Sequence, residues 1–192
     1  MEKKQYQKMI IITAPSGAGK TSITRHLMSK FPQLKFSISA ATRKPRANEK
    51  EGVDYYFISP EAFHEKILNE EFVEWEMVYE GKYYGTLKSE LRRMWGNDEV
   101  PVLDIDVQGA IHVKKEYPVN SLFIFIQPPS IVELKNRLEN RGSESPESLQ
   151  ARIGKASHEL SFKNQFEHII ENVDFAKACK EAELLVRSFL DN

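Results

Sequence analysis

Apolar residues along the chain gather into short continuous runs, and the segments between these runs carry apolar side chains at every third or fourth position. The four clearest runs are residues 9–13, 100–106, 122–126 and 168–172. Runs of this length that end at turn residues are typical of buried strands. The helix-like segments that follow them lie near residues 20–30, from 108, from 130, and near 174–190. This alternation predicts an α/β fold: a parallel sheet with helices on both faces and ligands at the carboxyl ends of its strands.

The pattern is different between about residues 36 and 96. Strand-like runs are short there, at residues 55–58, 72–75 and 77–79, and turn residues follow at 80–82. A helix is predicted near 60–69, because Ser59 suits the N-cap and Pro60 suits the first turn. We therefore expect an inserted α+β subdomain of antiparallel strands and one helix.

Residues 141–148 are polar and rich in turn-forming residues, and they lie between helical segments that carry Arg137 and Arg152. Composition alone favours a plain surface turn, but the arginines on both sides favour a mobile lid. We predict a single domain over residues 1–192. Its parts are a core of about 1–36, 97–136 and 156–192, an inserted subdomain of about 37–96, and a lid of about 137–155.

The composition excludes several classes of protein. The 192 residues are 41% hydrophobic and 29% charged, as is typical of a soluble globular protein. A net charge of −1 gives no overall attraction to nucleic acid or to an acidic membrane. No apolar run approaches the roughly 20 residues of a membrane span. The polar first eight residues lack the apolar stretch of a secretory signal, so we expect a cytoplasmic protein that binds neither nucleic acid nor membrane.

Cysteine and histidine indicate no further chemistry. The single cysteine, Cys179, cannot form an internal disulfide, and its place in a helical pattern is typical of a buried packing residue. The five histidines form no close pair, so neither a histidine metal site nor a histidine base is predicted. The oligomeric state stays open.

A phosphate-binding loop is predicted between the first strand and the first helix. Small residues let consecutive backbone N–H groups turn toward phosphate oxygens, and the helix N-terminus adds partial positive charge. Lys20 supplies a mobile charge, and Thr21 can offer its hydroxyl to Mg²⁺. The residues expected to contact ATP here are Ala14, Pro15, Ser16, Gly17, Ala18, Gly19, Lys20, Thr21 and Ser22.

Position 14 departs from the usual motif, which has glycine there. Ala14 must therefore adopt an ordinary φ, or the loop would be strained. An ordinary glycine-containing turn is the alternative to a phosphate loop. Such a turn would not require Lys20 and Thr21 directly after the second glycine.

Five further segments follow this loop, at residues 39–46, 52–55, 72–75, 83–86 and 103–109. Together with the loop, and in this order, they closely resemble the guanylate kinase family. The resemblance extends to residues 137–142 and Asn172, so it covers nearly the whole chain. Each segment alone is weakly specific, but the ordered set is highly specific. The resemblance implies a P-loop fold that transfers the γ-phosphoryl group of MgATP to GMP, and also to dGMP, with the preference between the two left open.

The basic segment 43–46 is a candidate site for the acceptor phosphate. Pro45 favours an extended backbone around Arg43 and Arg46, in which two guanidinium groups can converge on one phosphate. A solvated basic turn is the alternative for these residues taken alone. The resemblance implies that both arginines bind the GMP phosphate together with Tyr55 and Tyr84.

Guanine presents two neighbouring donors, N1–H and N2–H₂, that one carboxylate can accept together. Glu74 is the candidate, because it lies in an apolar strand where an unpaired carboxylate is costly. An outward-facing strand residue is the alternative. The resemblance assigns Glu74 and Asp106 to this edge of guanine, and Ser39 and Thr86 to hydroxyl contacts with the base. Thr86 is also placed to cap the helix that follows it.

Asp104 and Asp106 are two residues apart on a predicted strand, so we expect them to share a face at its carboxyl end. Such a pair needs cations or donors. Mg²⁺, held through water by Asp104 and by the Thr21 hydroxyl, and the guanine amino group at Asp106 would satisfy both. The neighbouring aromatic residues Trp75 and Tyr56 follow strand periodicity, which predicts core positions for them.

The expected reaction needs little covalent chemistry from the protein, because the GMP phosphate is already an anion. Catalysis is then positioning and charge neutralisation. The groups expected to neutralise charge are Lys20, Arg43, Arg137, Arg141 and Arg152. Resemblance alone places Asn172 near the adenine of ATP.

Two other functions stay open. One is an inactive scaffold of the same fold that binds proteins, which is expected to have lost the phosphate loop and the arginines; both are present here. The other is a kinase for another nucleoside monophosphate or another small phosphorylated acceptor. Glu74 argues against adenine as the base, since its carboxylate would repel the lone pair on adenine N1.

Overall fold

The computed structural model describes residues 7–139 and 146–192. Its central sheet has five strands in the order β2-β7-β1-β8-β9, and all neighbouring strands are parallel. The strands are β1 (Met9–Thr13), β2 (Leu34–Phe36), β7 (Val100–Asp104), β8 (Ser121–Gln127) and β9 (His168–Glu171). The strands predicted at the four apolar runs are confirmed, except that β7 ends at Asp104. The short edge strand β2 was not predicted, because three residues give no readable pattern.

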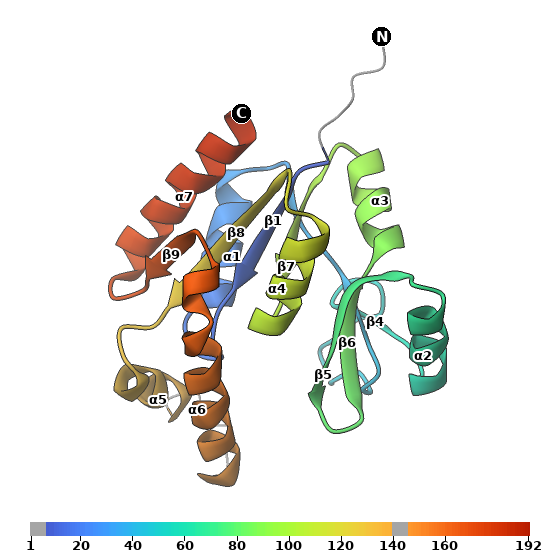
Figure 1. The fold of residues 1–192 in the computed structure, drawn as a ribbon, viewed down its shortest axis with the longest axis horizontal. Coiled ribbons are helices and arrows are strands. Elements are labelled where there is room, and N and C mark those ends of the chain that lie inside the picture. The colour runs from blue at the N-terminus through green and yellow to red at the C-terminus, as the bar shows by residue number, and fades with distance from the viewer. Residues whose placement is uncertain (1–6, 140–145) are drawn as a thin grey trace.

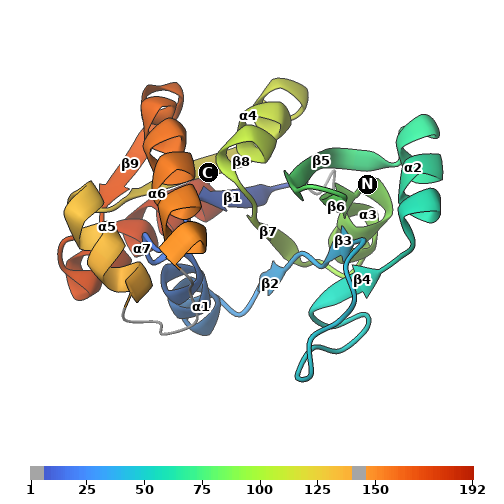
Figure 2. The same cartoon turned by 90° about the horizontal axis from the view of Figure 1, so that it is seen from below.

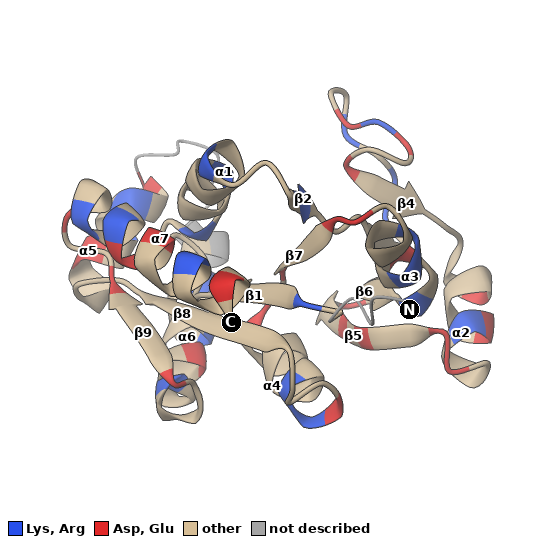
Figure 3. Ribbon diagram, turned by 90° about the horizontal axis from the view of Figure 1, so that it is seen from above, with Lys and Arg blue, Asp and Glu red and all other residues tan. Residues whose placement is uncertain are grey.

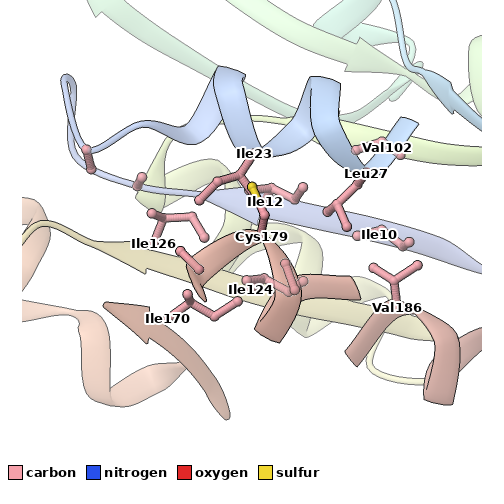
Figure 4. Close-up of a cluster of buried hydrophobic side chains, with 14 of the residues drawn as sticks. Ile10, Ile12, Ile23, Leu27, Val102, Ile124, Ile126, Ile170, Cys179 and Val186 are labelled. Atoms are coloured by element: carbon pink, nitrogen blue, oxygen red, sulfur yellow. The ribbon is translucent and has the colours of Figure 1, made fainter. Parts of the chain in front are cut away.

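Both faces of the central sheet are apolar, because successive strand residues point to opposite sides. Ile10 and Ile12 of β1 belong to a core with helices α1 (Lys20–Lys30) and α7 (Phe175–Asp191), as Figure 4 shows. Cys179 is buried in this core, as predicted. Ile11 belongs to a second core with helix α4 (Val107–Glu116). Burial on both faces explains why the strands read as continuous apolar runs.

A second sheet has four strands in the order β4-β3-β6-β5. The strands are β3 (Ser39–Ala41), β4 (Tyr55–Phe57), β5 (Phe72–Tyr79) and β6 (Lys82–Leu87). Strand β6 is antiparallel to β3 and β5, but β4 runs parallel to β3, so the prediction of antiparallel strands is wrong for β4. The long loop 42–54 returns the chain before β4 pairs, as a parallel neighbour requires. Residues 72–75 and 77–79 belong to one strand.

Helix α2 (Pro60–Leu68) begins as predicted. Ser59 accepts a hydrogen bond from the Ala62 N–H at 3.1 Å, and Pro60 occupies the first turn. Phe63 of α2 stacks on Phe72 of β5 with 4.3 Å between ring centroids. Helix α3 (Lys88–Gly96) then leads back to β7. The second sheet thus has a small apolar core of its own.

The core positions predicted for Trp75 and Tyr56 are only partly correct. Trp75 is 38% exposed, because its neighbour Glu74 takes the inward face of β5, toward Gly109 of α4. Alternate residues of a strand point to opposite faces, so Trp75 lies on the other face, beside the ring of Tyr83. Tyr56 is half-buried, and its hydroxyl donates to Glu90 Oε2 at 2.9 Å.

The second sheet and the helices α5 (Ile131–Glu139) and α6 (Pro146–Ser161) lie on opposite sides of the carboxyl edge of the central sheet (Figures 1 and 2). A short 3-10 helix at Lys163–Gln165 joins α6 to β9. Acidic and basic residues are interspersed over the elements in Figure 3. Within the described ranges, no helix combines the length and apolar character needed to cross a membrane. Residues 140–145 of the predicted lid, including Arg141, lie outside the described residues.

Candidate active site

A cavity of about 980 Å³ opens at the carboxyl ends of β1 and β7, where ligands bind in open α/β sheets. Its walls come from the loop after β1, from α1, from the segment before β4, from the end of β7 and from α6. The predicted site residues that line it are Ala14, Pro15, Ser16, Gly17, Gly19, Lys20, Thr21, Ser22, Tyr55, Asp104, Asp106 and Arg152. The volume is that of a site for a small molecule such as a nucleotide.

The loop between β1 and α1 has the backbone geometry of a phosphate site. Gly17 and Gly19 adopt φ of 92° and 100°, which side chains rarely allow. Helix α1 begins directly after Gly19, and no side chain caps its first turn, so its partial positive charge is directed at the cavity. Ala14 is not among the positive-φ residues of the described chain. Its ordinary φ, expected from the sequence, explains why alanine is tolerated there.

Lys20 is held at the mouth of this loop by the end of β7. Its Nζ lies 2.5 Å from Asp104 Oδ1 and donates to the Ile105 carbonyl at 3.0 Å. The Thr21 hydroxyl lies 3.5 Å from the other Asp104 oxygen. A hydroxyl and a carboxylate are the hard oxygen ligands that Mg²⁺ prefers. In the described part of the chain, no cluster of three or more His, Cys, Asp or Glu side chains could hold a metal.

Asn172, predicted near adenine, is turned toward the loop itself. It is buried, and its Nδ2 donates to the Ala18 carbonyl at 2.7 Å. A Cβ on Gly19 would overlap this amide. Arg137 Nη2 in turn donates to the backbone carbonyl of Asn172 at 3.1 Å. The side chain therefore braces the phosphate loop, a role that the sequence pattern did not reveal.

Asp106 does not lie on the strand that carries Asp104. Strand β7 ends at Asp104, and Asp106 is the N-cap of α4, where its Oδ1 accepts the Gly109 N–H at 2.9 Å. The expectation that strand alternation places both carboxylates on one face is therefore wrong. Both still line the cavity, because the short connection to α4 turns Asp106 toward it. The other Asp106 oxygen lies 3.5 Å from Lys155 Nζ.

Glu74 is the most deeply buried acidic group of the predicted site, with 5% of its surface exposed. Its Oε1 accepts the Thr86 hydroxyl at 2.7 Å. Burial raises the pKa of Glu74 to about 7, and the nearby negative charge of Asp106 adds to the rise. The outward-facing alternative is therefore wrong. The capping alternative for Thr86 is also wrong, because α3 starts after Leu87 and no side chain caps it.

Gly109, in the first turn of α4, makes room for the Glu74 carboxylate. A Cβ at this position would lie 2.7 Å from Glu74 Oε2, closer than the two atoms can approach without movement. The absence of a side chain lets Glu74 of β5 and Asp106 of α4 approach the same corner of the site. The register of the second sheet also brings Ser39 close to Thr86. Ala40 of β3 pairs with Gly85 of the antiparallel strand β6, so the residue before Ala40 lies near the residue after Gly85.

The predicted phosphate-binding arginines are arranged around an unexpected acid, Glu49. Arg43 donates to the two Glu49 carboxylate oxygens at 2.5 and 2.6 Å, and its Nε donates to the Tyr84 hydroxyl at 3.0 Å. The guanidinium lies over the ring of Tyr55, 4.9 Å from its centroid. Arg46 has an exposed side chain, and its backbone N–H donates to Glu49 at 2.8 Å.

Helix α6 contributes a charged wall opposite the phosphate loop. Arg152, Lys155 and Glu159 line the cavity there. Lys155 Nζ lies 3.7 Å from Glu159 Oε1, and burial raises the pKa of Glu159. Arg137 lies on α5, where its Nε donates to Glu133 at 3.0 Å. Glu159 was not predicted as a site residue, because a lone acid in an amphipathic helix carries no signal of its own.

The family model described as guanylate kinase matches residues 6–189 of this chain. The guanylate kinase of Bacteroides fragilis is 45% identical over 183 residues, which cover 95% of this chain and 90% of that protein. The guanylate kinase of Porphyromonas gingivalis is 43% identical over 184 residues, with 95% and 98% covered. The crystal structure of guanylate kinase from Anaplasma phagocytophilum has a TM-score of 0.74 and 28% identity, covering 94% of this chain and 85% of that one.

These matches extend across the central sheet, the second sheet and the C-terminal helices, so they do not rest on the phosphate loop alone. The resemblance inferred from the sequence and the parallel α/β fold are both confirmed. The chain belongs to the guanylate kinase family.

Proposed function

We propose that this protein is an ATP-dependent guanylate kinase, which transfers the γ-phosphoryl group of ATP to GMP, and also to dGMP, in the cytoplasm. The observation that carries the proposal is that one cavity is lined by both the phosphate loop and Asp106. The buried Glu74 lies next to Asp106, because both side chains approach Gly109. A donor nucleotide at the loop and a guanine at these carboxylates would face each other within one site.

The donor phosphates would bind where α1 begins. Lys20, which now interacts with Asp104, begins this helix and would bind a phosphate held by the loop. Asn172 fixes the loop backbone through Ala18. The protein thus supplies a preorganised set of positive groups, which is the main requirement for phosphoryl transfer.

Mg²⁺ fits this donor end. Thr21 and Asp104 would hold it, and when bound it would neutralise charge on the phosphate oxygens. The distance of 3.5 Å between the Thr21 hydroxyl and Asp104 keeps both oxygens near one point, in line with the expected contact of Asp104 through water.

The acceptor would be recognised at two ends. Its phosphate would meet Arg43, Tyr84, Tyr55 and the exposed side chain of Arg46, while Arg137, Arg141 and Arg152 remain candidates for the transferring group. Its base would meet Glu74, Asp106, Thr86 and Ser39. Adenine would bind less well than guanine here, because the ionised Glu74 would face the lone pair on adenine N1, where guanine carries a proton.

Binding of GMP should be coupled to proton release. The pKa of Glu74 is raised from 4.5 to about 7, so the free protein carries a proton on this group below that pH. Guanine donors favour the ionised carboxylate and lower its pKa, so binding expels the proton. Affinity should fall by about tenfold for each pH unit below 7, because one proton competes with the base.

Calorimetry at pH 6 in buffers of different ionisation enthalpy measures this release. Guanosine should be titrated beside GMP, because a phosphate monoester also ionises near pH 6. We expect guanosine binding to release up to one proton in the wild type and none in Glu74→Gln. Wild-type protein that binds guanosine without proton release would contradict the ionisation assigned to Glu74.

The function itself is tested by a coupled assay of ADP release with GMP, AMP, CMP, UMP and dTMP as acceptors. We expect turnover with GMP to exceed turnover with the others by several orders of magnitude, since a site of buried hydrogen bonds discriminates by about 10⁴-fold. Preference for another acceptor would indicate a different nucleoside monophosphate kinase. Absence of turnover with every acceptor would indicate a binding scaffold.

A further inference from the structure

Glu49 lies in the loop between β3 and β4 and binds three donors at once. Its two oxygens accept both terminal nitrogens of Arg43, at 2.5 and 2.6 Å, and one of them also accepts the Arg46 backbone N–H at 2.8 Å. The Glu49 and Arg43 side chains are only 15% and 10% exposed. Hydrogen bonds from Arg43 lower the pKa of Glu49 to about 2, so the pair is ionised throughout the physiological range.

The hydrogen bonds of Arg43 show which of its edges is open. A guanidinium has five N–H donors. Glu49 accepts one N–H from each terminal nitrogen. The Lys44 carbonyl accepts the second N–H of Nη1 at 3.1 Å, and the Tyr84 hydroxyl accepts Nε–H at 3.0 Å. The remaining Nη2–H lies on the same edge as Nε, beside the Tyr84 hydroxyl. This N–H can donate to an anion while the carboxylate stays bound to the neighbouring edge, and the Tyr84 hydroxyl, which accepts Nε–H, can donate its own proton to the same anion.

We propose that Glu49 is a positioning residue, which holds Arg43 so that its remaining Nη2–H and the Tyr84 hydroxyl together receive the acceptor phosphate. The inference rests on the proposed function. Tyr55, over which the guanidinium lies, lines the cavity, so the arginine is fixed at the border of the nucleotide site. Because Glu49 fixes the orientation in advance, less side-chain freedom is lost when the phosphate binds.

If Glu49 instead blocked the phosphate site, its removal would change the affinity for GMP in the opposite direction. If the Glu49 carboxylate occupied the place of the phosphate, it would have to leave before GMP could bind, and its removal would tighten binding. Three features favour positioning: the carboxylate is also bound by the Arg46 N–H, it belongs to the same loop as Arg43, and it takes only one of the two N–H groups of Nη2. Direct binding measurements separate the two roles by the direction of the change.

The test is Glu49→Gln, which keeps size and removes charge. An amide places an N–H₂ group against one of the three donors, so Arg43 should lose its fixed orientation. We expect the Kd and KM for GMP to rise about tenfold, the loss expected for one charge-assisted hydrogen bond. Binding of guanosine, which lacks the phosphate, and the KM for ATP should change less than about twofold, and Glu49→Asp should recover part of the GMP affinity.

Glu51→Gln is the matched control, because Glu51 lies in the same loop and accepts the Phe57 N–H at 2.9 Å, which a glutamine oxygen can still do. It should leave GMP affinity unchanged. Unchanged or tighter GMP binding by Glu49→Gln, or an equal loss of guanosine and GMP binding, would overturn the positioning role. Wild-type protein without a preference for GMP over guanosine would instead overturn the proposed function, and this role with it.

Discussion

Replacing Lys20 with alanine is expected to lower turnover by roughly a hundredfold or more, the loss typical of a single charge-stabilising group, while GMP binding stays nearly unchanged. Lys20 begins the helix that follows the phosphate loop and is directed to the donor end by Asp104. The predicted guanine contacts Glu74 and Thr86 lie on the second sheet. Steady-state rates at saturating ATP and GMP, with GMP binding by calorimetry, measure the two effects separately.

Lys114→Ala is a suitable control for the loss of one lysine. Its Nζ donates to the Gln165 carbonyl and to Glu167, and it does not line the cavity. Turnover of this variant should equal that of the wild type. Melting temperatures should accompany both variants, because Lys20→Ala leaves Asp104 without its cation. If folded Lys20→Ala protein retained turnover within a few-fold of the wild type, the donor role of Lys20 would be wrong.

Glu74→Gln should damage the choice of base selectively. The Thr86 hydroxyl donates to one oxygen of this side chain, so an amide that keeps this bond turns its N–H₂ toward the donors of guanine. Losing half of the match should cost several kcal/mol, on the order of a hundredfold or more in the preference for GMP over AMP. The KM for GMP should rise sharply. Ratios of kcat/KM for the two acceptors measure the effect.

Glu71→Gln is the matched control for this second variant. Glu71 lies just before the same strand and pairs with Lys66 at 2.9 Å on the surface, so its neutralisation should leave the acceptor preference intact. ATP binding by calorimetry should be unchanged in both variants. If Glu74→Gln kept the wild-type preference for GMP, base recognition would pass to Asp106, Ser39 and Thr86.

The central fold could be predicted because its strands are buried on both faces and therefore read as continuous apolar runs. The phosphate loop could be predicted because its glycines, lysine and threonine are adjacent in sequence. The direction of β4 could not, since parallel pairing with β3 depends on the course of the loop 42–54 and not on local pattern. The position of Asp106 was missed because strand periodicity was extended beyond Asp104, where β7 ends.

Partners of the predicted side chains were harder to find than the side chains themselves. Glu74 stood out as an acid in an apolar strand, but nothing in a polar loop marks Glu49 as the residue that binds Arg43. Asn172 is separated from Ala18 by 154 positions, and only the folded chain brings them together. The resemblance to the family predicted residues that would face ligands, whereas the residues that orient them were found only in the structure.

Gly109 shows how such an arrangement limits engineering of the protein. A glycine in a helix is usually an easy target for thermostabilisation, because alanine favours the helix by about 1 kcal/mol. Here the added methyl group would press on the buried carboxylate of Glu74. Gly109→Ala should therefore lower the melting temperature instead of raising it, and a stabilisation strategy that replaces helical glycines by rule would also disturb the carboxylate predicted to select the base.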